Sequence, residues 1–341
     1  MKDYHRLSVA PMMAYTDRHF RFMMRQFTKR TLLYTEMVVG NTITYNLNSD
    51  FLDRVLKYDP IEHPIAVQLG GDDPKILATA ARVCEEYGYD EINLNVGCPS
   101  DRVQRGRFGA CLMKEPERVA EVVTAMRDVV SIPVNVKHRL GVDDLDSYEH
   151  LCRFIEIVSQ SGNDLFIAHA RKAWLKGLSP AQNRSVPPLR YDLIYQLKQD
   201  FPHLDIVING GIQTLAETKE HLKHVDGVMV GRAAYQQPEL FGEADHVIFG
   251  EPPREPIDEL GLMAALNEYA RREVASGLKF SLVGKHLVGL FKNRPRARRW
   301  RQAVSRLIQD NPKTFDLVEL YIKTFGYTPA ELTQSAHPEA S

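Results

Sequence analysis

The sequence has no long apolar run and few cysteines, and both absences restrict what the protein can be. No stretch reaches the roughly 18 apolar residues of a membrane-spanning helix, and the opening MKDYHRLSVAPMMAY shows no signal-peptide pattern. The four cysteines form no CxxC pair and show no metal-ligand spacing, which favours free thiols in a reducing compartment. We therefore expect a cytoplasmic protein that has no membrane span and holds no metal.

A large net charge and a dinucleotide fingerprint are also missing. The 43 Lys and Arg residues nearly balance the 44 Asp and Glu residues, so the formal net charge of -1 excludes polyanion binding by bulk charge. No G-x-G-x-x-G follows the first apolar run, although a doubly wound nucleotide-binding domain would need one. Binding of a nucleotide or a polyanion therefore has to depend on local clusters of residues.

What the sequence does contain is an alternation of short apolar runs and longer amphipathic segments. Each run is short, apolar and β-rich, as a strand buried on both faces should be. The eight runs are Leu7–Met13, Leu32–Val38, Ile65–Gly71, Glu91–Gly97, Pro133–Gly141, Asp164–Arg171, Asp205–Ile212 and Gly227–Ala234. Between them, segments such as Asp73–Gly88 and Glu115–Val130 carry apolar residues at helical spacing. Eight β-then-α units predict an α/β fold, a (β/α)8 TIM barrel.

The pattern changes after about residue 249. The segment GEPPREP, Gly250–Pro256, is typical of a linker, and only helical patterns follow it. We therefore expect a catalytic barrel over residues 1–249, a small C-terminal helical domain over 257–325 and a frayed tail over 326–341.

In a TIM barrel, side chains at the C-terminal ends of the strands face the active site. Here those ends carry polar residues where a purely structural core would have Val, Ile or Leu. Lys137 and Arg139 share one side of their strand, and so do His169 and Arg171. Lys137 is open to three interpretations: a Schiff-base lysine, a phosphate contact or a donor to a flavin ring. For His169 we favour a role in the site over that of a satisfied structural histidine.

Two glycine-rich turns, Asn209-Gly210-Gly211 and Gly231-Arg232, follow the predicted seventh and eighth strands. Glycines let backbone N–H groups approach a phosphate, and these two strands form the usual phosphate site of the fold. The alternative is that the turns merely need glycine. We favour a phosphate-bearing ligand, and an aldolase-type sugar-phosphate barrel would look similar.

Cys98 follows the predicted fourth strand. Free cysteine often acts as a small hydrophobe, but a place at the strand end favours chemistry. A nucleophile would need a nearby base, and the loop over residues 100–109 contains no histidine. A general acid needs a protonated thiol, the ordinary state of cysteine at neutral pH. We therefore favour Cys98 as an acid, and we expect Gly106 and Gly109 to let the loop move.

The segment Lys285–Arg306 contains eight basic residues and neither Asp nor Glu. A solvated helix face normally mixes the two signs, so this asymmetry favours contact with a phosphate backbone. Arg184, Arg190 and other basic residues would add positive charge around the barrel mouth. We therefore expect a polyanion larger than a small metabolite.

Seven motifs taken together resemble the tRNA-dihydrouridine synthases, flavin enzymes that reduce uridines in tRNA. They are APMMAYTDRHFR, IAVQLGG, NLNVGCPSDRV, NVKHRLG, IAHAR, INGGI and VGRAA, and the resemblance covers nearly the whole chain. The form VGCPSDRVQRGRFGACLM is similar to the A subfamily, whose members act on D-loop uridines at or beside position 20. The resemblance implies FMN as cofactor, NADPH as reductant and tRNA as partner. We further expect a monomer.

The resemblance also implies a role for individual residues. The implied FMN-binding residues are Pro11, Met12, Met13, Gln68, Lys137, His169, Asn209, Gly210, Gly211, Gly231 and Arg232. Cys98 is the implied proton donor to uracil C5, while C6 receives a hydride from FMN N5 after the base has flipped into the barrel mouth. The implied tRNA contacts are Asn95, Arg139, Arg171, Asn183, Arg184, Arg296 and Arg299.

Two other functions remain open on the sequence alone. Another FMN barrel could act on a free pyrimidine, but the basic segment Lys285–Arg306 argues against it, since a metabolite needs no such surface. An RNA-binding or folding factor with a degenerate barrel is the second alternative. The intact set of polar strand-end residues argues against that one.

Overall fold

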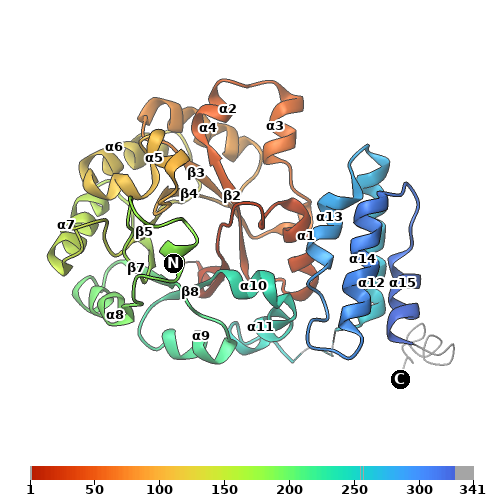
Figure 1. Cartoon of the computed structure of the whole chain (residues 1–341). Coiled ribbons are helices and arrows are strands. Elements are labelled where there is room, and N and C mark those ends of the chain that lie inside the picture. The colour runs from red at the N-terminus through yellow and green to blue at the C-terminus, as the bar shows by residue number, and fades with distance from the viewer. Residues whose placement is uncertain (1, 254, 256, 327–341) are drawn as a thin grey trace. The chain divides into compact units, whose positions relative to one another are not determined.

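Eight parallel strands close into a barrel in the order β1 to β8, and β1 pairs with β8. The computed structural model describes residues 2–253, 255 and 257–326. Figure 1 shows the strands inside a ring of helices. The strands are β1 Leu7–Val9, β2 Leu32–Val39, β3 Ile65–Gly70, β4 Glu91–Val96, β5 Val134–Arg139, β6 Leu165–His169, β7 Asp205–Asn209 and β8 Gly227–Val230. Each coincides with a predicted run to within a few residues, so the predicted barrel is confirmed.

Helices follow the strands around the barrel. They are α1 Arg18–Phe27, α2 Gly40–Thr44, α3 Ser49–Leu56, α4 Pro74–Glu86, α5 Asp101–Arg105, α6 Pro116–Arg127, α7 Tyr148–Ser159, α8 Tyr191–Asp200, α9 Leu215–His221 and α10 Arg232–Gln236. Short 3-10 helices are η1 Asp3–Arg6, η2 Pro60–Glu62, η3 Gly109–Lys114 and η4 Gln182–Arg184. Local sequence sets the starts: the Asp73 carboxylate accepts from the N–H groups of Lys75 and Ile76, and Pro74 fits the first turn of α4.

The barrel interior changes from apolar to polar along the strands. Its apolar cluster consists of Ala10, Leu32, Tyr34, Ala66, Leu165, Ile167, Val207 and Met229. A row of carboxamides crosses three neighbouring strands, because Gln68 is in register with Asn93, and Asn93 with Asn135. All three side chains are buried. Charged side chains follow near the strand ends, which gives the mouth its polar character.

The chain divides into two compact units, residues 1–21 with 30–233, and residues 22–29 with everything from 234 onward. The second unit contains η5 Pro238–Glu243, α11 Ala244–Val247, α12 Glu259–Ala275, α13 Phe280–Leu287, α14 Ala297–Asp310 and α15 Leu317–Phe325. It includes the end of α1, since Asp245 accepts hydrogen bonds from Thr28 Oγ1 and from the N–H of Lys29.

These limits differ from the predicted division at residues 249 and 257, so the predicted domain bounds stay a prediction. Of the predicted tail, residues 327–341 lie outside the described part of the chain. Among the described residues, no helix is both long enough and apolar enough to cross a bilayer.

The helical unit is built on an aromatic core. Trp300 of α14 is fully buried, and its indole N–H donates to the carbonyl of Leu287 at 2.8 Å. The Phe291 ring lies edge-on to it, with centroids 5.4 Å apart. On the same helix Arg298 and Arg299 are exposed. Helix α14 therefore presents an apolar face to its own core and a basic face to solvent.

Candidate active site at the mouth of the barrel

Basic side chains gather at the C-terminal ends of β5 and β6 and at the turn after β8. The His169 ring lies within electrostatic range of four cations, which are Lys137, Arg139, Arg171 and Arg232. Within the described residues, no carboxylate forms an ion pair with any of the four cations. An uncompensated cluster of this kind attracts an anionic ligand.

Lys137 and His169 are the least satisfied members of this cluster. Burial lowers the pKa of Lys137 from 10.5 to about 7, and the neighbouring charge of Arg139 acts in the same direction. Burial also lowers the pKa of His169 well below its ordinary value, with further lowering from Arg139 and Lys137. His169 Nδ1 is buried and has no hydrogen-bond partner among the described residues. A ligand with negative charge or acceptor atoms would stabilise both groups.

Two of the implied tRNA contacts, Arg139 and Arg171, are held by backbone carbonyls. Arg139 is buried, donating from Nε to Gly97 at 3.2 Å and from Nη1 to Asn183 at 2.9 Å. Burial lowers the pKa of Arg139 to about 10. Arg171 donates from Nη1 to the carbonyl of Pro187. Both guanidinium groups are thus oriented by the protein while their charge is left unneutralised.

Cys98 lies immediately beyond β4 in a backbone that is fixed at several points. Its N–H donates to Asn95 Oδ1 at 2.9 Å, and its carbonyl accepts from the N–H of Ala110 at 2.9 Å. Its thiol donates to Ser100 Oγ at 3.6 Å. Cys98 is half-buried, and no histidine hydrogen-bonds to its thiol within the described chain. This arrangement suits a proton donor better than a base-activated nucleophile.

The glycines after Cys98 have a packing role that the sequence did not suggest. At Gly109, whose φ is +75°, an added Cβ would lie 2.5 Å from the carbonyl oxygen of Cys98. At Gly106, an added Cβ would lie 2.4 Å from the Phe108 ring. Both glycines are therefore explained by close packing, and movement of the loop stays a prediction.

Gln68 and Asn95 are joined directly. Asn95 Nδ2 donates to Gln68 Oε1 at 2.8 Å, and Asn95 Oδ1 accepts from the N–H groups of Gly97 and Cys98. A predicted cofactor residue and a predicted tRNA residue thus belong to one hydrogen-bonded group. Asn93 and Asn135, which stand at period-two spacing from Asn95 and Lys137 on the same strands, extend this group.

The two glycine-rich turns, after β7 and after β8, contain glycine for different physical reasons. Gly210 and Gly211 have φ values of +114° and +79°, so the backbone alone explains both. Asn209 donates from Nδ2 to the carbonyl of Met229 at 2.7 Å. At Gly231, by contrast, φ is not positive, and an added Cβ would find only Ala10 Cβ, at 3.9 Å. The open space beside Gly231 is what a closely approaching ligand would use.

The turn after β1 provides an apolar surface. The Met12 carbonyl accepts from the N–H groups of Tyr15 and Thr16, which closes the turn behind Pro11. Met12 packs against the barrel core, whereas Met13 is 57% exposed. An exposed methionine beside the mouth suits contact with a flat apolar ring.

Among the predicted tRNA contacts, Asn183 lies where its side chain offers tRNA no surface. It is fully buried, its Oδ1 accepts from the N–H of Trp174 at 2.8 Å, and its Nδ2 donates to the Trp174 carbonyl at 2.9 Å. The geometry therefore gives this residue the task of shaping the loop after β6. Its neighbour Arg184 is exposed, and Arg232 donates to the Arg184 carbonyl at 3.3 Å.

The two predicted contacts in the helical unit are both exposed, but only one is engaged. Arg296 donates from Nη1 to the carbonyl of Phe325 at 2.9 Å, and its φ is +70° where α14 begins. Arg299, on the basic face of α14, makes no side-chain ion pair with another described residue. Both assignments stay predictions.

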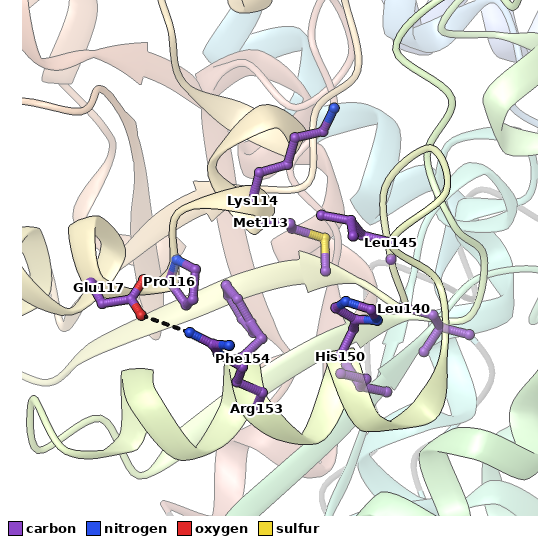
Figure 2. A pocket seen from close by; sticks show the side chains of 11 residues that line it. Met113, Lys114, Pro116, Glu117, Leu140, Leu145, His150, Arg153 and Phe154 are labelled. Atoms are coloured by element: carbon purple, nitrogen blue, oxygen red, sulfur yellow. Dashed lines mark hydrogen bonds and ion pairs between the residues drawn. The ribbon is translucent and has the colours of Figure 1, made fainter.

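A pocket on the rim of the barrel provides a contrast with the mouth. It has a volume of about 220 Å³ and lies between the starts of α6 and α7, as Figure 2 shows. Its cations are already neutralised, because Lys114 pairs with Asp143 at 2.7 Å and Arg153 with Glu117 at 3.3 Å. The described residues also contain no group of His, Cys, Asp or Glu side chains that could hold a metal ion. The unneutralised charge is at the mouth, which makes the mouth the candidate active site.

Comparison with known proteins gives a consistent result over nearly the whole chain. The family model for dihydrouridine synthase matches residues 8–324. A "tRNA-dihydrouridine(20/20a) synthase" from Vibrio vulnificus is 53% identical over 329 residues, covering 96% of this chain and 98% of that protein. Proteins of the same name from Escherichia coli strain K12 and Yersinia pestis are 54% and 52% identical over 301 residues, each covering 88% of this chain and 86% of the relative. The chain belongs to the dihydrouridine synthase family.

Proposed function

We propose that this protein reduces uridines in the D-loop of tRNA, at positions 20 and 20a, to 5,6-dihydrouridine. The observation that carries the proposal is the combination at one mouth of a half-buried cysteine, Cys98, with a cluster of cations that no carboxylate of the described residues neutralises. The name printed for the relatives, "tRNA-dihydrouridine(20/20a) synthase", supports the substrate and the positions.

The residues of the mouth fit FMN. His169 Nδ1 has no hydrogen-bond partner among the described residues, and burial disfavours the charged amine of Lys137. Polar or anionic atoms of a flavin ring would stabilise both groups. The open space at Gly231 and the exposed guanidinium of Arg232 suit a phosphate. Met13 supplies an exposed apolar contact. We infer that these residues hold FMN and that NADPH provides the reducing equivalents.

When bound, the flavin supplies a hydride to C6 of the uracil ring. The protein then has to deliver a proton to C5, and the Cys98 thiol is placed to do so; the S–H bond breaks as the C–H bond forms, and solvent returns the proton to sulfur. Hydride addition puts negative charge on the uracil O4 enolate. Arg139 and Arg171, both held by backbone carbonyls, can stabilise that charge.

A stacked uridine cannot reach a barrel mouth, so we propose that the target base flips out of the tRNA. The basic face of α14 supplies the contact with the phosphate backbone, and binding should weaken steeply with salt. A free pyrimidine would need no such surface, which favours tRNA over a small substrate.

The test is to map dihydrouridine in tRNA from cells with and without the gene, and to assay the purified protein with NADPH. We expect a yellow protein, loss of dihydrouridine at positions 20 and 20a in the deletion strain, and turnover on tRNA. Comparable turnover on free uridine would favour a metabolic barrel. A colourless protein that binds tRNA without reducing it would favour an RNA-binding factor.

A further inference from the structure

A chain of carboxamides, half-buried at Asn95 and buried at Gln68, Asn93 and Asn135, runs from the backbone of Cys98 across the barrel interior. The Cys98 N–H donates to Asn95 Oδ1 at 2.9 Å, and Asn95 Nδ2 donates to Gln68 Oε1 at 2.8 Å. Gln68 Nε2 then donates to Asn93 Oδ1 at 2.7 Å, and Asn93 Nδ2 donates to Asn135 Oδ1 at 2.6 Å. The chain therefore connects strands β3, β4 and β5 through side chains alone.

Every hydrogen bond in this chain points in the same direction. Each amide accepts from the neighbour nearer Cys98 and donates to the neighbour farther away, so no member can flip without breaking two bonds. Asn93 and Gln68 are 0% and 1% exposed, which excludes water as an alternative partner for most of their polar atoms. A one-way chain in a buried setting is rigid, and its members polarise one another.

The far end of the chain is open. Asn135 is 2% exposed, and its Nδ2 is buried with no hydrogen-bond partner among the described residues. A buried donor without a partner is unfavourable by about 1–3 kcal/mol. Unlike other such atoms, this one belongs to a residue on the same side of β5 as Lys137 and Arg139, and we therefore take the ligand of the mouth as its partner. Since the free atom is a donor, the ligand atom that completes the chain is an acceptor, such as a carbonyl oxygen or an unprotonated ring nitrogen.

We propose that Asn93 and Asn135 are positioning residues, and that their carboxamides transmit the position of the bound cofactor to the backbone of Cys98. The inference rests on the proposed function, because it takes the ligand of the mouth to be the flavin and Cys98 to be the acid. A hydrogen bond to the mouth ligand holds the Asn135 carboxamide in one orientation, and Asn135 in turn orients Asn93. The same constraint passes through Gln68 and Asn95 to the N–H of Cys98.

A purely structural role explains this arrangement less well. Strand pairing between β3, β4 and β5 is already provided by their backbone ladders. Carboxamides inside a barrel are unfavourable compared with Val or Ile unless all their polar atoms are satisfied, and here one donor is not. Positioning matters for a proton donor because a displacement of about 1 Å reduces a rate by roughly a hundredfold.

The test uses Asn93→Leu, which keeps the branched shape of the side chain and removes both of its hydrogen bonds, with Asn93→Ala as a second variant. The first readout is alkylation of Cys98 by iodoacetamide in the enzyme as purified, followed by mass spectrometry of the Cys98 peptide. We expect a rise of roughly three- to tenfold in the alkylation rate, because the backbone that holds the thiol is released.

The second readout is single-turnover kinetics with the flavin-loaded enzyme. Flavin content and the rate of flavin reduction by NADPH are measured on the same sample, so that a displaced cofactor is distinguished from a displaced thiol. Reoxidation by tRNA should fall by roughly a hundredfold. Adding Asn93→Leu to Asn95→Ala should cause little further loss, because both residues act along one chain.

Asn163→Leu is the matched control. Asn163 is also a buried carboxamide with one unpaired polar atom, but it lies before β6, where Nδ2 donates to Leu165 at 3.0 Å. This variant should leave both readouts unchanged.

Wild-type alkylation of Cys98 in both folded Asn93 variants would overturn the inference, as would strictly additive losses with Asn95→Ala. If the proposed function is itself wrong, wild-type enzyme will not be reoxidised by tRNA. The alkylation measurement needs neither tRNA nor turnover, so it decides the inference separately.

Discussion

The mouth and the floor of the barrel use the same kinds of polar side chain in opposite ways. At the floor, the buried carboxylate of Glu91 lies 2.8 Å from His5 Nε2 and accepts from the Tyr34 hydroxyl at 2.8 Å. Nearby in the same unit, the carboxylate of Glu62 lies 2.6 Å from Arg21 Nε, and both groups are buried. At the mouth, Lys137 is half-buried and Arg139 is buried, but their like charges repel, and neither pairs with a carboxylate of the described residues.

The difference shows which end of the barrel is complete without a ligand. A buried pair is balanced by its partner, so removing either member leaves an unfavourable charge behind. Buried cations without a partner are unfavourable from the start, and they persist only where something else supplies the opposite charge. The floor therefore contributes to stability, and the mouth contributes to binding and chemistry.

The sharpest test of this division is Cys98→Ala at the mouth. Loss of a general acid typically reduces a rate by about 10²–10⁴-fold. We expect that loss in tRNA-dependent flavin reoxidation, with unchanged flavin content, NADPH-driven reduction and thermal stability, all measurable on one preparation. Cys84→Ala is the control, because Cys84 is fully buried in α4. Unchanged reoxidation in the Cys98 variant would remove the acid role.

A substitution at the floor should have the opposite effect, lowering stability while leaving activity per folded molecule unchanged. Glu91→Ala leaves His5 and Tyr34 without their partner, and breaking a buried pair destabilises by about 3–5 kcal/mol. We expect a clear drop in melting temperature, with rates per folded molecule near wild type. Glu121→Ala is the control, because Glu121 forms only an exposed pair with Arg118 and should change stability by less than about 1 kcal/mol. A selective loss of turnover in the Glu91 variant would contradict the division.

The polar mouth could be predicted from the sequence, because the residues at each strand end are close together in the chain and follow a recognisable apolar run. Period-two spacing placed Lys137 beside Arg139 and His169 beside Arg171, and apolar runs between helical segments gave the barrel. Fold position alone predicts a chemical role for Cys98, because the residue follows the C-terminal end of a barrel strand.

The remainder depends on contacts between distant segments. His5 and Glu91 meet only once the barrel closes, and nothing near either residue indicates the other. The carboxamide of Asn183 bonds to Trp174 across a loop whose path the sequence does not specify, and the tRNA contact of this residue stays a prediction. The order of donors from Asn95 to Asn135 likewise requires the register of β3, β4 and β5.

The basic face of α14 extends the comparison to Arg298 and Arg299, exposed cations that form no ion pair with another residue in the described part of the chain. Reversing Arg298 and Arg299 to Glu should raise the dissociation constant for tRNA by roughly tenfold or more at low salt and reduce its salt dependence. NADPH oxidation by the bound flavin should not change. Reversing Arg118 and Arg153, which pair with Glu121 and Glu117, is the control with the same change in charge. Loss of NADPH oxidation instead would assign the helical unit a different role.

The smallest expected effect is a pH dependence that originates at Lys137. Its pKa of about 7 lies below the ordinary 10.5 because burial disfavours the charged amine. An unfolded chain holds this proton up to pH 10.5, so in the ligand-free protein the group destabilises the fold below that pH, fully so below about 7, and the penalty disappears as pH rises between the two values.

An anionic ligand beside the amine raises its pKa again, so binding above about pH 7 has to take up a proton. The dissociation constant for FMN should therefore rise with pH, by at most about tenfold per unit between pH 7 and 9. Titrations of FMN into Lys137→Met should lose this slope, whereas Lys198→Met, at an amine that already pairs with Asp226, should keep it. A slope that persists without Lys137 would mean that another group at the mouth takes up the proton, and that Lys137 is not the cation that the ligand neutralises.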